Sequence, residues 1–318
     1  MDELFPSGSK GLLVLAACVA CASCDRGAAT VSTQGARPVG QGGSAALRIA
    51  ALAPALNEAL FAVGCGARVV LRDPASDFPA AVRRLPSTNP FALAIEHIAA
   101  FSPDLVLLNH VDVRRARGLE RLGPRVISFD PQSVAAVLEA IEAIGRLCDA
   151  RPAAERLVGR LRHELAAVAA GVQSRRRPSV YVELDGSNPQ QPWTVGSRSF
   201  IADLVRRAGG RPLFESVARA AWQVNAEAVL RAAPEVIVLS VPWTARAAAR
   251  RGLLLRPGWA QVPALREGRI IDGLDPALLS RPGPRLVEGV AALARALHPA
   301  AFGALPAAEQ ARLPWRPR

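Results

Sequence analysis

Two segments of this chain share one pattern, and together they set the strongest limit on its fold. The segments read AIEHIAAFSPDLVLL from Ala94 and NAEAVLRAAPEVIVL from Asn225, and they align without a gap. Each predicts a short helix, a proline that ends it, an acidic residue and a continuous apolar strand, which is typical of a parallel sheet covered on both faces. A repeat at this spacing is too long for a solenoid. The chain is therefore expected to form two α/β lobes of similar plan.

The rest of the chain fits this plan, because segments with strand and helix patterns alternate along it. The longest helical stripe, Pro152 to Val172, lies between the two copies of the repeat. We expect an N-terminal α/β lobe over 47–150, a connecting helix over 151–173, a C-terminal α/β lobe over 174–298 and a loosely attached tail over 299–318.

The N-terminal segment is not expected to belong to the folded lobes. Residues 1–24 hold a short apolar run with the layout of a secretory signal, too short to span a bilayer. The motif LAAC at Leu15–Cys18 resembles a bacterial lipobox, which implies lipidation at Cys18. Cys21 and Cys24 are rival positions, and an uncleaved apolar N-terminus is the alternative. Residues 25–46 are expected to form a flexible tether.

The charge distribution and the absence of certain motifs argue against two classes of function, nucleic-acid binding and catalysis. The formal charge is +12 and is carried almost wholly by arginine, since Lys10 is the only lysine. The arginines are scattered and no DNA- or RNA-binding motif accompanies them, so we expect no nucleic-acid partner. The chain has no GxSxG, HExxH, P-loop or dinucleotide fingerprint, which argues against an enzyme.

Two cysteines, Cys65 and Cys148, lie beyond the N-terminal segment. An exported location would permit a disulfide between them, whereas two isolated cysteines are more often small buried hydrophobes. The sequence leaves both possibilities open. No metal-ligand spacing is present outside the signal and tether, so we expect no metal site.

Five longer segments are similar, in order, to one known family. They read RIAALAPALNEALFAVGCGARVV, IEHIAAFSPDLVLL, WTVGSRSFIADLVRRAGG, GWAQVPALREGRIIDG and RPGPRLVEGVAALARALHP, and they span Leu47 to Pro299. They resemble the helical-backbone (class III) periplasmic binding proteins, which are the substrate-binding components of ABC importers for cobalamin, haem and ferric siderophores. The motifs SDFP, WTVG and RPGPR, with the tryptophan before VNAEAVL, look like the cobalamin-binding branch.

The resemblance implies a fold, a function and a location. It implies an α/β fold of two Rossmann-like lobes with central parallel sheets, joined by a single long backbone helix. It implies capture of cobalamin or a related corrinoid in the cleft between the lobes, and delivery to an ABC permease with its ATPase. The protein would be a periplasmic monomer anchored to the membrane through its lipid, with cobalamin as transported ligand and with no cofactor or catalytic residue.

The resemblance also gives the repeat a role. In this family an acidic residue on each lobe docks onto arginines of the permease, and Glu96 and Glu227 occupy matching positions in the two copies. One carboxylate on each lobe would also fix orientation on a two-fold partner. The alternative is that each glutamate only stabilises the dipole of its helix from the first turn. Both roles are compatible.

Ligands of open α/β lobes lie beyond the carboxyl ends of the strands. The corrin of cobalamin is flat and carries amides, which favours aromatic faces and few charges. This rule and the resemblance give six ligand-binding candidates: Trp193, Trp222, His110, Phe78, Phe91 and Asp275. The alternatives are hydrophobic plugs for the tryptophans, plain packing for the phenylalanines and a half-exposed loop residue for His110. Trp243 fits either role, and Trp259 is expected in the core.

Other ligands and classes stay open. Haem needs an axial donor, and His110 is the main candidate because Tyr181, the only tyrosine, lies inside a predicted strand. A ferric siderophore would be bound by a cluster of cationic groups, which the many arginines could supply. A structural or adhesion lipoprotein is the alternative outside ligand transport.

Overall fold

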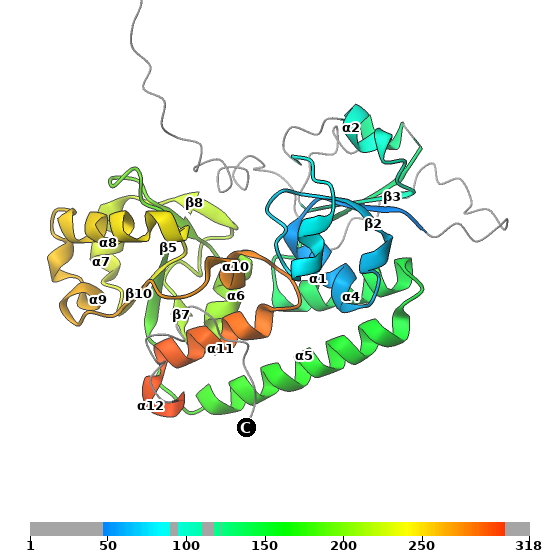
Figure 1. Ribbon diagram of the computed structural model, residues 1–318. Helices are drawn as coiled ribbons and strands as arrows, with labels where there is room; N and C mark the ends of the chain where they lie inside the picture. The colour runs from blue at the N-terminus through cyan, green and yellow to red at the C-terminus, as the bar shows by residue number, and fades with distance from the viewer. Residues whose placement is uncertain (1–46, 90–94, 110–117, 122, 303–318) are drawn as a thin grey trace, which may run out of the picture.

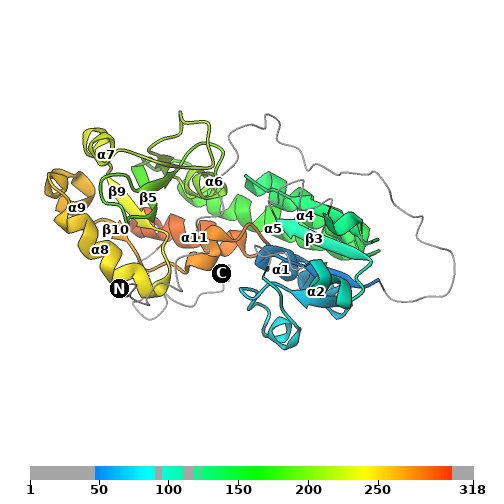
Figure 2. The ribbon, with the colours of Figure 1, turned by 90° about the horizontal axis from the view of Figure 1, so that it is seen from above.

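The computed structural model describes residues 47–89, 95–109, 118–121 and 123–302, and these form two α/β lobes. Figure 1 shows the lobes next to each other above one long helix, and Figure 2 shows the same arrangement from above. The expected α/β class is confirmed. Among the described residues, no helix is both long and apolar enough to cross a lipid bilayer.

The N-terminal lobe is built on a parallel sheet whose described strands follow the order β2-β1-β3-β4. These strands are β1 (Ile49–Ala51), β2 (Val69–Arg72), β3 (Leu105–Asn109) and β4 (Arg125–Phe129). In β3, which lies between β1 and β4, the first four residues are buried, as expected of an apolar run covered on both faces. The helices of this lobe within the described residues are α1 (Pro54–Ala62), α2 (Ile95–Ala100) and α4 (Val134–Leu147).

The C-terminal lobe holds a mixed sheet in the order β10-β9-β5-β6-β8, with β7 beside the start of β5. Its strands are β5 (Ser179–Asp185), β6 (Trp193–Val195), β7 (Arg211–Pro212), β8 (Ala221–Gln223), β9 (Val236–Leu239) and β10 (Ile270–Ile271). Its helices are α6 (Phe200–Arg207), α7 (Ala226–Ala232), α8 (Arg246–Leu255), α9 (Pro263–Arg266), α10 (Pro276–Ser280) and α11 (Leu286–Leu297).

This second sheet is not wholly parallel, unlike the expected one. β9 runs parallel to β5, but β6 runs antiparallel to both β5 and β8. The reason is the length of the loop 186–192 between β5 and β6. A parallel pair needs a crossover of a dozen residues or more, so this shorter loop returns the chain as a hairpin.

The helix between the lobes is α5 (Arg151–Val172), and it runs beneath both of them (Figure 1). At 1.5 Å per residue its 22 residues span about 33 Å. Pro152 stands in the first turn, where a helix does not need the missing N–H. The buried residues recur every three or four positions and form one apolar face: Ala154, Leu157, Val158, Leu161, Leu165, Val168 and Val172.

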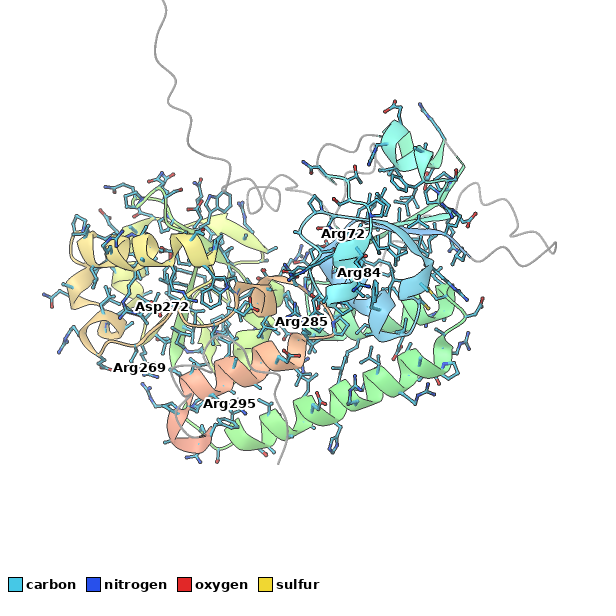
Figure 3. All side chains as sticks on the ribbon, in the orientation of Figure 1. Arg72, Arg84, Arg269, Asp272, Arg285 and Arg295 are labelled. Atoms are coloured by element: carbon cyan, nitrogen blue, oxygen red, sulfur yellow. The ribbon has the colours of Figure 1, made fainter. Side chains whose placement is uncertain are left out.

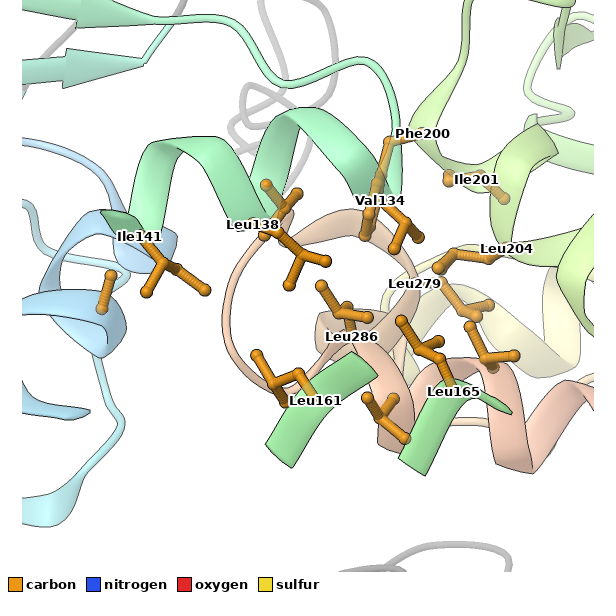
Figure 4. Packing of buried hydrophobic residues seen from close by; sticks show 14 of the residues in the cluster. Val134, Leu138, Ile141, Leu161, Leu165, Phe200, Ile201, Leu204, Leu279 and Leu286 are labelled. Carbon is orange, nitrogen blue, oxygen red and sulfur yellow. The ribbon is translucent and has the colours of Figure 1, made fainter. Parts of the chain in front are cut away.

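One continuous hydrophobic core joins the lobes through this helix. The same cluster of buried side chains contains Leu105 of the first sheet, Leu161 of α5 and Val180 of the second sheet. Figure 4 shows the middle of this cluster, where side chains of α4, α5, α6, α10 and α11 meet. α4 lies close to α5, because a Cβ on Gly145 would come within 2.4 Å of the Ala154 Cβ. Only glycine therefore permits this helix crossing.

The segment expected as a tail from residue 299 begins with a short helix, α12 (Pro299–Phe302). The Phe302 ring lies against Gly171 near the end of α5, where an added Cβ would be 2.6 Å from the ring. Residues 299–302 are therefore attached to the connecting helix, and residues 303–318 lie outside the described part of the chain.

The two copies of the repeat use their acidic residue in the same way. In the first lobe the Asp104 carboxylate accepts the Arg48 backbone N–H at 2.8 Å, just before β1. In the second lobe the Glu235 carboxylate accepts the Ser179 backbone N–H at 2.8 Å, at the start of β5. Burial raises the pKa of Glu235, but the Ser179 N–H and the Arg176 guanidinium outweigh it and hold that pKa below its ordinary value. Each carboxylate thus ties the repeat strand to its neighbour.

We expect Asp104→Ala and Glu235→Ala to destabilise the protein, because each removes the acceptor of a strand N–H. The loss in the free energy of unfolding should be about 1 kcal/mol at Asp104, where the bond is exposed, and about 2 kcal/mol at Glu235, where it is half-buried. Urea denaturation measures both. Glu267→Ala, at an exposed carboxylate, is the control and should leave the midpoint unchanged. Wild-type midpoints for both repeat variants would contradict this role.

Candidate functional site

Loops of the two lobes meet at one junction. The loop that follows β2 contacts the loop 281–285 between α10 and α11. The Arg281 guanidinium lies 2.5 Å from the Asp77 carboxylate and donates to the Ala75 carbonyl at 3.1 Å. A Cβ on Gly283 would come within 3.3 Å of the Ala55 backbone in α1. The RPGPR motif of the sequence therefore makes one of the contacts between the second lobe and the first.

A buried carboxylate holds this junction. Glu58 of α1 has a side chain only 2% exposed, and Arg285 binds it with two hydrogen bonds of 2.7 and 3.0 Å. The Arg281 guanidinium is 3.6 Å from the same carboxylate. Figure 3 shows Arg285 between the lobes. Removing one partner of such a pair leaves an uncompensated buried charge, so this contact fixes the two lobes relative to each other.

A polar network supports the loop after β2. The Asn57 amide donates to the Ala51 carbonyl at 2.7 Å and to the Ser76 hydroxyl at 2.9 Å. The Ser76 hydroxyl in turn donates to the buried Asp73 carboxylate. Burial raises the pKa of Asp73, although the Ser76 hydrogen bond opposes the change. At Asp77, burial also raises the pKa, but Arg281 outweighs it and holds the value below the ordinary one.

In the described part of each lobe, an exposed phenylalanine or tryptophan ring lies beyond the end of a parallel strand. Phe78 follows β2 and is 46% exposed, and Trp243 follows β9 and is 44% exposed. A guanidinium covers one face of each ring: Arg285 lies 4.5 Å from the Phe78 centroid, and Arg246 lies 3.6 Å from the Trp243 centroid. These cation–π contacts orient the rings, so that each can offer its other face to a planar ligand.

The two tryptophans expected to bind together do not share a surface. Thr194 pairs with Trp222 across β6 and β8, so these two side chains lie on one face of the sheet and Trp193 lies on the other. In agreement, Trp193 packs against the core that contains α5, whereas Trp222 packs against a separate cluster and meets the Phe214 ring edge-to-face at 5.4 Å. Both are partly buried, which agrees with the alternative that they are hydrophobic plugs.

The other predicted site residues fall in three groups. Asp275 caps α10, because one carboxylate oxygen accepts the Ala277 N–H at 2.9 Å. Glu96 and Glu227 are exposed in the first turns of α2 and α7, which lie far apart on the two lobes in both views (Figures 1 and 2). The remaining three predicted residues lie outside the described part of the chain: Phe91, His110 and Cys18.

The interior of the second lobe contains a further ion pair with a structural role. Arg256 binds Glu183 at 2.6 and 3.0 Å, and their side chains are 2% and 0% exposed. The Tyr181 hydroxyl donates to the same carboxylate, and the Trp259 ring lies 4.5 Å from the guanidinium carbon. Trp259 is thus a core residue, as expected. Among the described residues no group of three or more His, Cys, Asp or Glu could hold a metal ion.

Sequence reasoning missed Glu58 and left Trp243 undecided. An acidic residue within the apolar helix ALNEALFA was a signal for a buried carboxylate, since such a charge needs a partner. The spacing of Trp243 and Arg246 after an apolar strand was a signal for a stacked pair. Neither pattern names the partner or the exposed face, which depend on residues far away in the sequence.

Comparison with known proteins identifies the family to which this chain belongs. The sequence model of the periplasmic binding protein family matches residues 49–277, which is most of the chain. The chain belongs to this family. The expected family is therefore confirmed at this level, while its cobalamin-binding branch stays a prediction.

Three similar proteins are binding proteins, and the names of two of them state a ligand. YvrC of Bacillus subtilis, an uncharacterized ABC transporter substrate-binding lipoprotein, is 27% identical over 80% of this chain and 81% of its own length. A cobalamin-binding protein of Halobacterium salinarum is 29% identical over 64% of this chain and 56% of its own. The solved structure of the periplasmic heme-binding protein RhuT from Roseiflexus sp. RS-1 is 26% identical, with a TM-score of 0.72 over 81% of this chain and 100% of its own. All three are named as binding proteins rather than enzymes.

Near the junction, Glu288 of α11 makes the stability of this periplasmic binding protein depend on pH. Burial raises the pKa of Glu288 to about 6, and the carboxylates of Glu58 and Asp275 add to this while Arg285 opposes it. The folded state therefore holds this proton more tightly than the unfolded state does.

We expect the contribution of Glu288 to stability to be favourable at low pH and to be lost as pH rises from about 4.5 through about 6, the window between the ordinary and the raised pKa. Glu288→Gln should remove this decline and stabilise the protein at pH 7 by about 1–2 kcal/mol. Urea denaturation at several pH values tests it, with Glu139→Gln, an exposed residue of α4, as control. A decline of unchanged steepness in Glu288→Gln would contradict the assignment.

Proposed function

We propose that this periplasmic binding protein is the substrate-binding component of an ABC importer and that it captures cobalamin or a related corrinoid between its lobes. The observation that carries the proposal is the pair of exposed rings, Phe78 and Trp243, one on each lobe and each backed by an arginine. Two fixed aromatic faces suit a broad flat ligand, because aromatic burial dominates recognition where water is excluded.

The charges at the junction favour a ligand with little negative charge. Arg281 and Arg285 are already paired with Glu58 and Asp77, so their charge is largely neutralised. An anionic ferric siderophore would be bound more tightly by cationic side chains that have no carboxylate partner. The amide side chains of a corrin need hydrogen-bond partners and few charges, which agrees better with this surface.

Haem is the second candidate, since RhuT carries that ligand in its name. A tyrosine ligand to iron is not available, because Tyr181 is 0% exposed and hydrogen-bonded to Glu183. Coordination of haem iron would therefore depend on His110, which lies outside the described residues. The named cobalamin-binding relative and the short motifs of the sequence favour the corrinoid.

We expect Trp243→Ala and Phe78→Ala each to weaken cobalamin binding by about 1–3 kcal/mol, in the range of interface hot spots. Titration of the purified chain with cyanocobalamin, followed by its visible absorbance, measures the affinity, and haemin is titrated in parallel. Leu255→Ala is the matched control, because Leu255 is 81% exposed and lies at the end of α8.

Each outcome of this titration discriminates between models. If the protein binds haemin but not cobalamin, the second candidate, haem transport, would be the better description of its function. Cobalamin binding at wild-type affinity in both ring variants would show that the ligand occupies another surface. Binding of neither ligand would remove both candidates.

We infer that Glu96 and Glu227 dock the protein onto its permease. Both are exposed, both stand in the first turn of the repeat helix, and they lie on different lobes of a body whose halves are joined by a buried ion pair. A fixed separation between two carboxylates selects a partner with two matching cationic sites.

The double variant Glu96→Ala/Glu227→Ala should bind ligand normally and lose most transport in vesicles that contain the permease and its ATPase. The matched control is Glu139→Ala/Glu267→Ala, which also removes one exposed carboxylate from each lobe. Equal uptake with both double variants would exclude docking through the repeat helices.

We further propose that the protein is held at the membrane through a lipid on Cys18, in line with the lipoprotein YvrC. Radiolabelled palmitate should enter the wild-type chain and be lost in Cys18→Ser. Labelling that persists in Cys18→Ser and disappears in Cys21→Ser or Cys24→Ser would move the anchor to that rival position.

A further inference from the structure

Two cysteines that are 83 residues apart in the sequence lie together in the first lobe. Cys65 stands between α1 and β2, and Cys148 is the C-cap of α4. Both are buried, with 5% and 1% of their surface exposed, and both are free thiols. The Cys65 thiol donates to the Cys148 carbonyl oxygen, with the Sγ 4.0 Å from that oxygen, and Cys65 is close enough to raise the pKa of the Cys148 thiol.

The surroundings of the pair hold both residues in place. The Arg68 guanidinium donates to the Cys148 carbonyl at 2.8 Å, which joins the turn before β2 to the end of α4. Asp149 then adopts a left-handed backbone conformation with φ 54°, and α5 begins two residues later. The pair therefore sits where the first lobe is attached to the connecting helix.

We propose that Cys65 and Cys148 form a disulfide in the exported protein, and that this bond fastens the first lobe to the start of α5. The contact between the Cys65 thiol and the Cys148 backbone supplies the proximity that a disulfide requires. Membership of the periplasmic binding protein family implies an oxidising compartment, because exported proteins are exposed to oxidants that cytosolic proteins do not meet. Two small apolar residues would fill the same space, but only two cysteines can be joined there.

The bond forms by two thiol–disulfide exchanges. One cysteine thiolate attacks the disulfide of an oxidant, either a small-molecule disulfide or a disulfide oxidoreductase, and forms a mixed disulfide with release of one thiol. The second cysteine thiolate then displaces the second thiol. The two protein thiols are oxidised, the oxidant disulfide is reduced to two thiols, and their two protons are retained by the products.

The two cysteines are expected to be oxidised during folding, before the thiols are buried. Burial, together with the Cys65 thiol, raises the pKa of Cys148 to about 12, so the folded reduced protein contains very little of the reactive thiolate. The bond is therefore expected to form while the segment between the cysteines is still closing. Once formed, it is shielded from reductants by the same burial.

Peptide mapping of the full chain, expressed with its own N-terminal segment and recovered from the exported fraction, tests the proposal. Free thiols are blocked by alkylation in denaturant, and trypsin is then applied without reduction. The expected product is residues 49–68 linked to residues 147–156, which separate after reduction. Alkylated Cys65 and Cys148, or either residue bonded to another thiol, would overturn the proposal.

Thermal unfolding gives a second readout. Reduction during unfolding should lower the Tm of the wild type by about 5–10 °C, because the bond closes a long loop of the unfolded chain. The variant Cys65→Ala/Cys148→Ala should show no response to reductant. An equal response in both proteins would overturn the structural role of the bond, and the mapping of the wild type stands even where the double variant folds poorly.

Discussion

The burial of one face of α5 by both lobes is the interaction on which the rest of this structure depends. The apolar stripe of that helix packs against α4 of the first lobe and α11 of the second, and the side chains between them form one continuous core. A hinge made of crossing strands would leave two separate cores. Here a change in the angle between the lobes would open the shared core, and close packing makes such openings costly.

The ion pair between Glu58 and Arg285 adds a second constraint at the junction. It is buried, so its partners cannot separate without leaving a charge in a medium of low polarity. Together the shared core and the ion pair keep the two lobes at a set spacing. This accounts for the form of the proposed site, in which fixed aromatic rings rather than closing lobes meet the ligand.

The sequence pattern predicted the site less well than the fold. Phe78 was expected near a ligand because it belongs to the SDFP motif of the resemblance, and it does stand exposed beyond β2. Trp193 and Trp222 were chosen because the resemblance places aromatic residues at their positions, but which face a strand residue occupies depends on the register of its partner. That register joins β6 to β8, which are separated in the chain by α6 and β7, so the local sequence does not specify it. The stacked arginines were likewise invisible, since Arg285 and Phe78 are distant in the chain.

By itself the sequence determined the α/β class, the two related lobes and the helix between them. Each follows from local periodicity, because a helix or a covered strand must place its apolar residues at fixed intervals. Tertiary structure alone decided that Asp104 and Glu235 tie strands, that Glu58 holds the lobes together and that Cys65 meets Cys148. These contacts join residues far apart in the chain, and proximity of that kind is created only when the common core is packed.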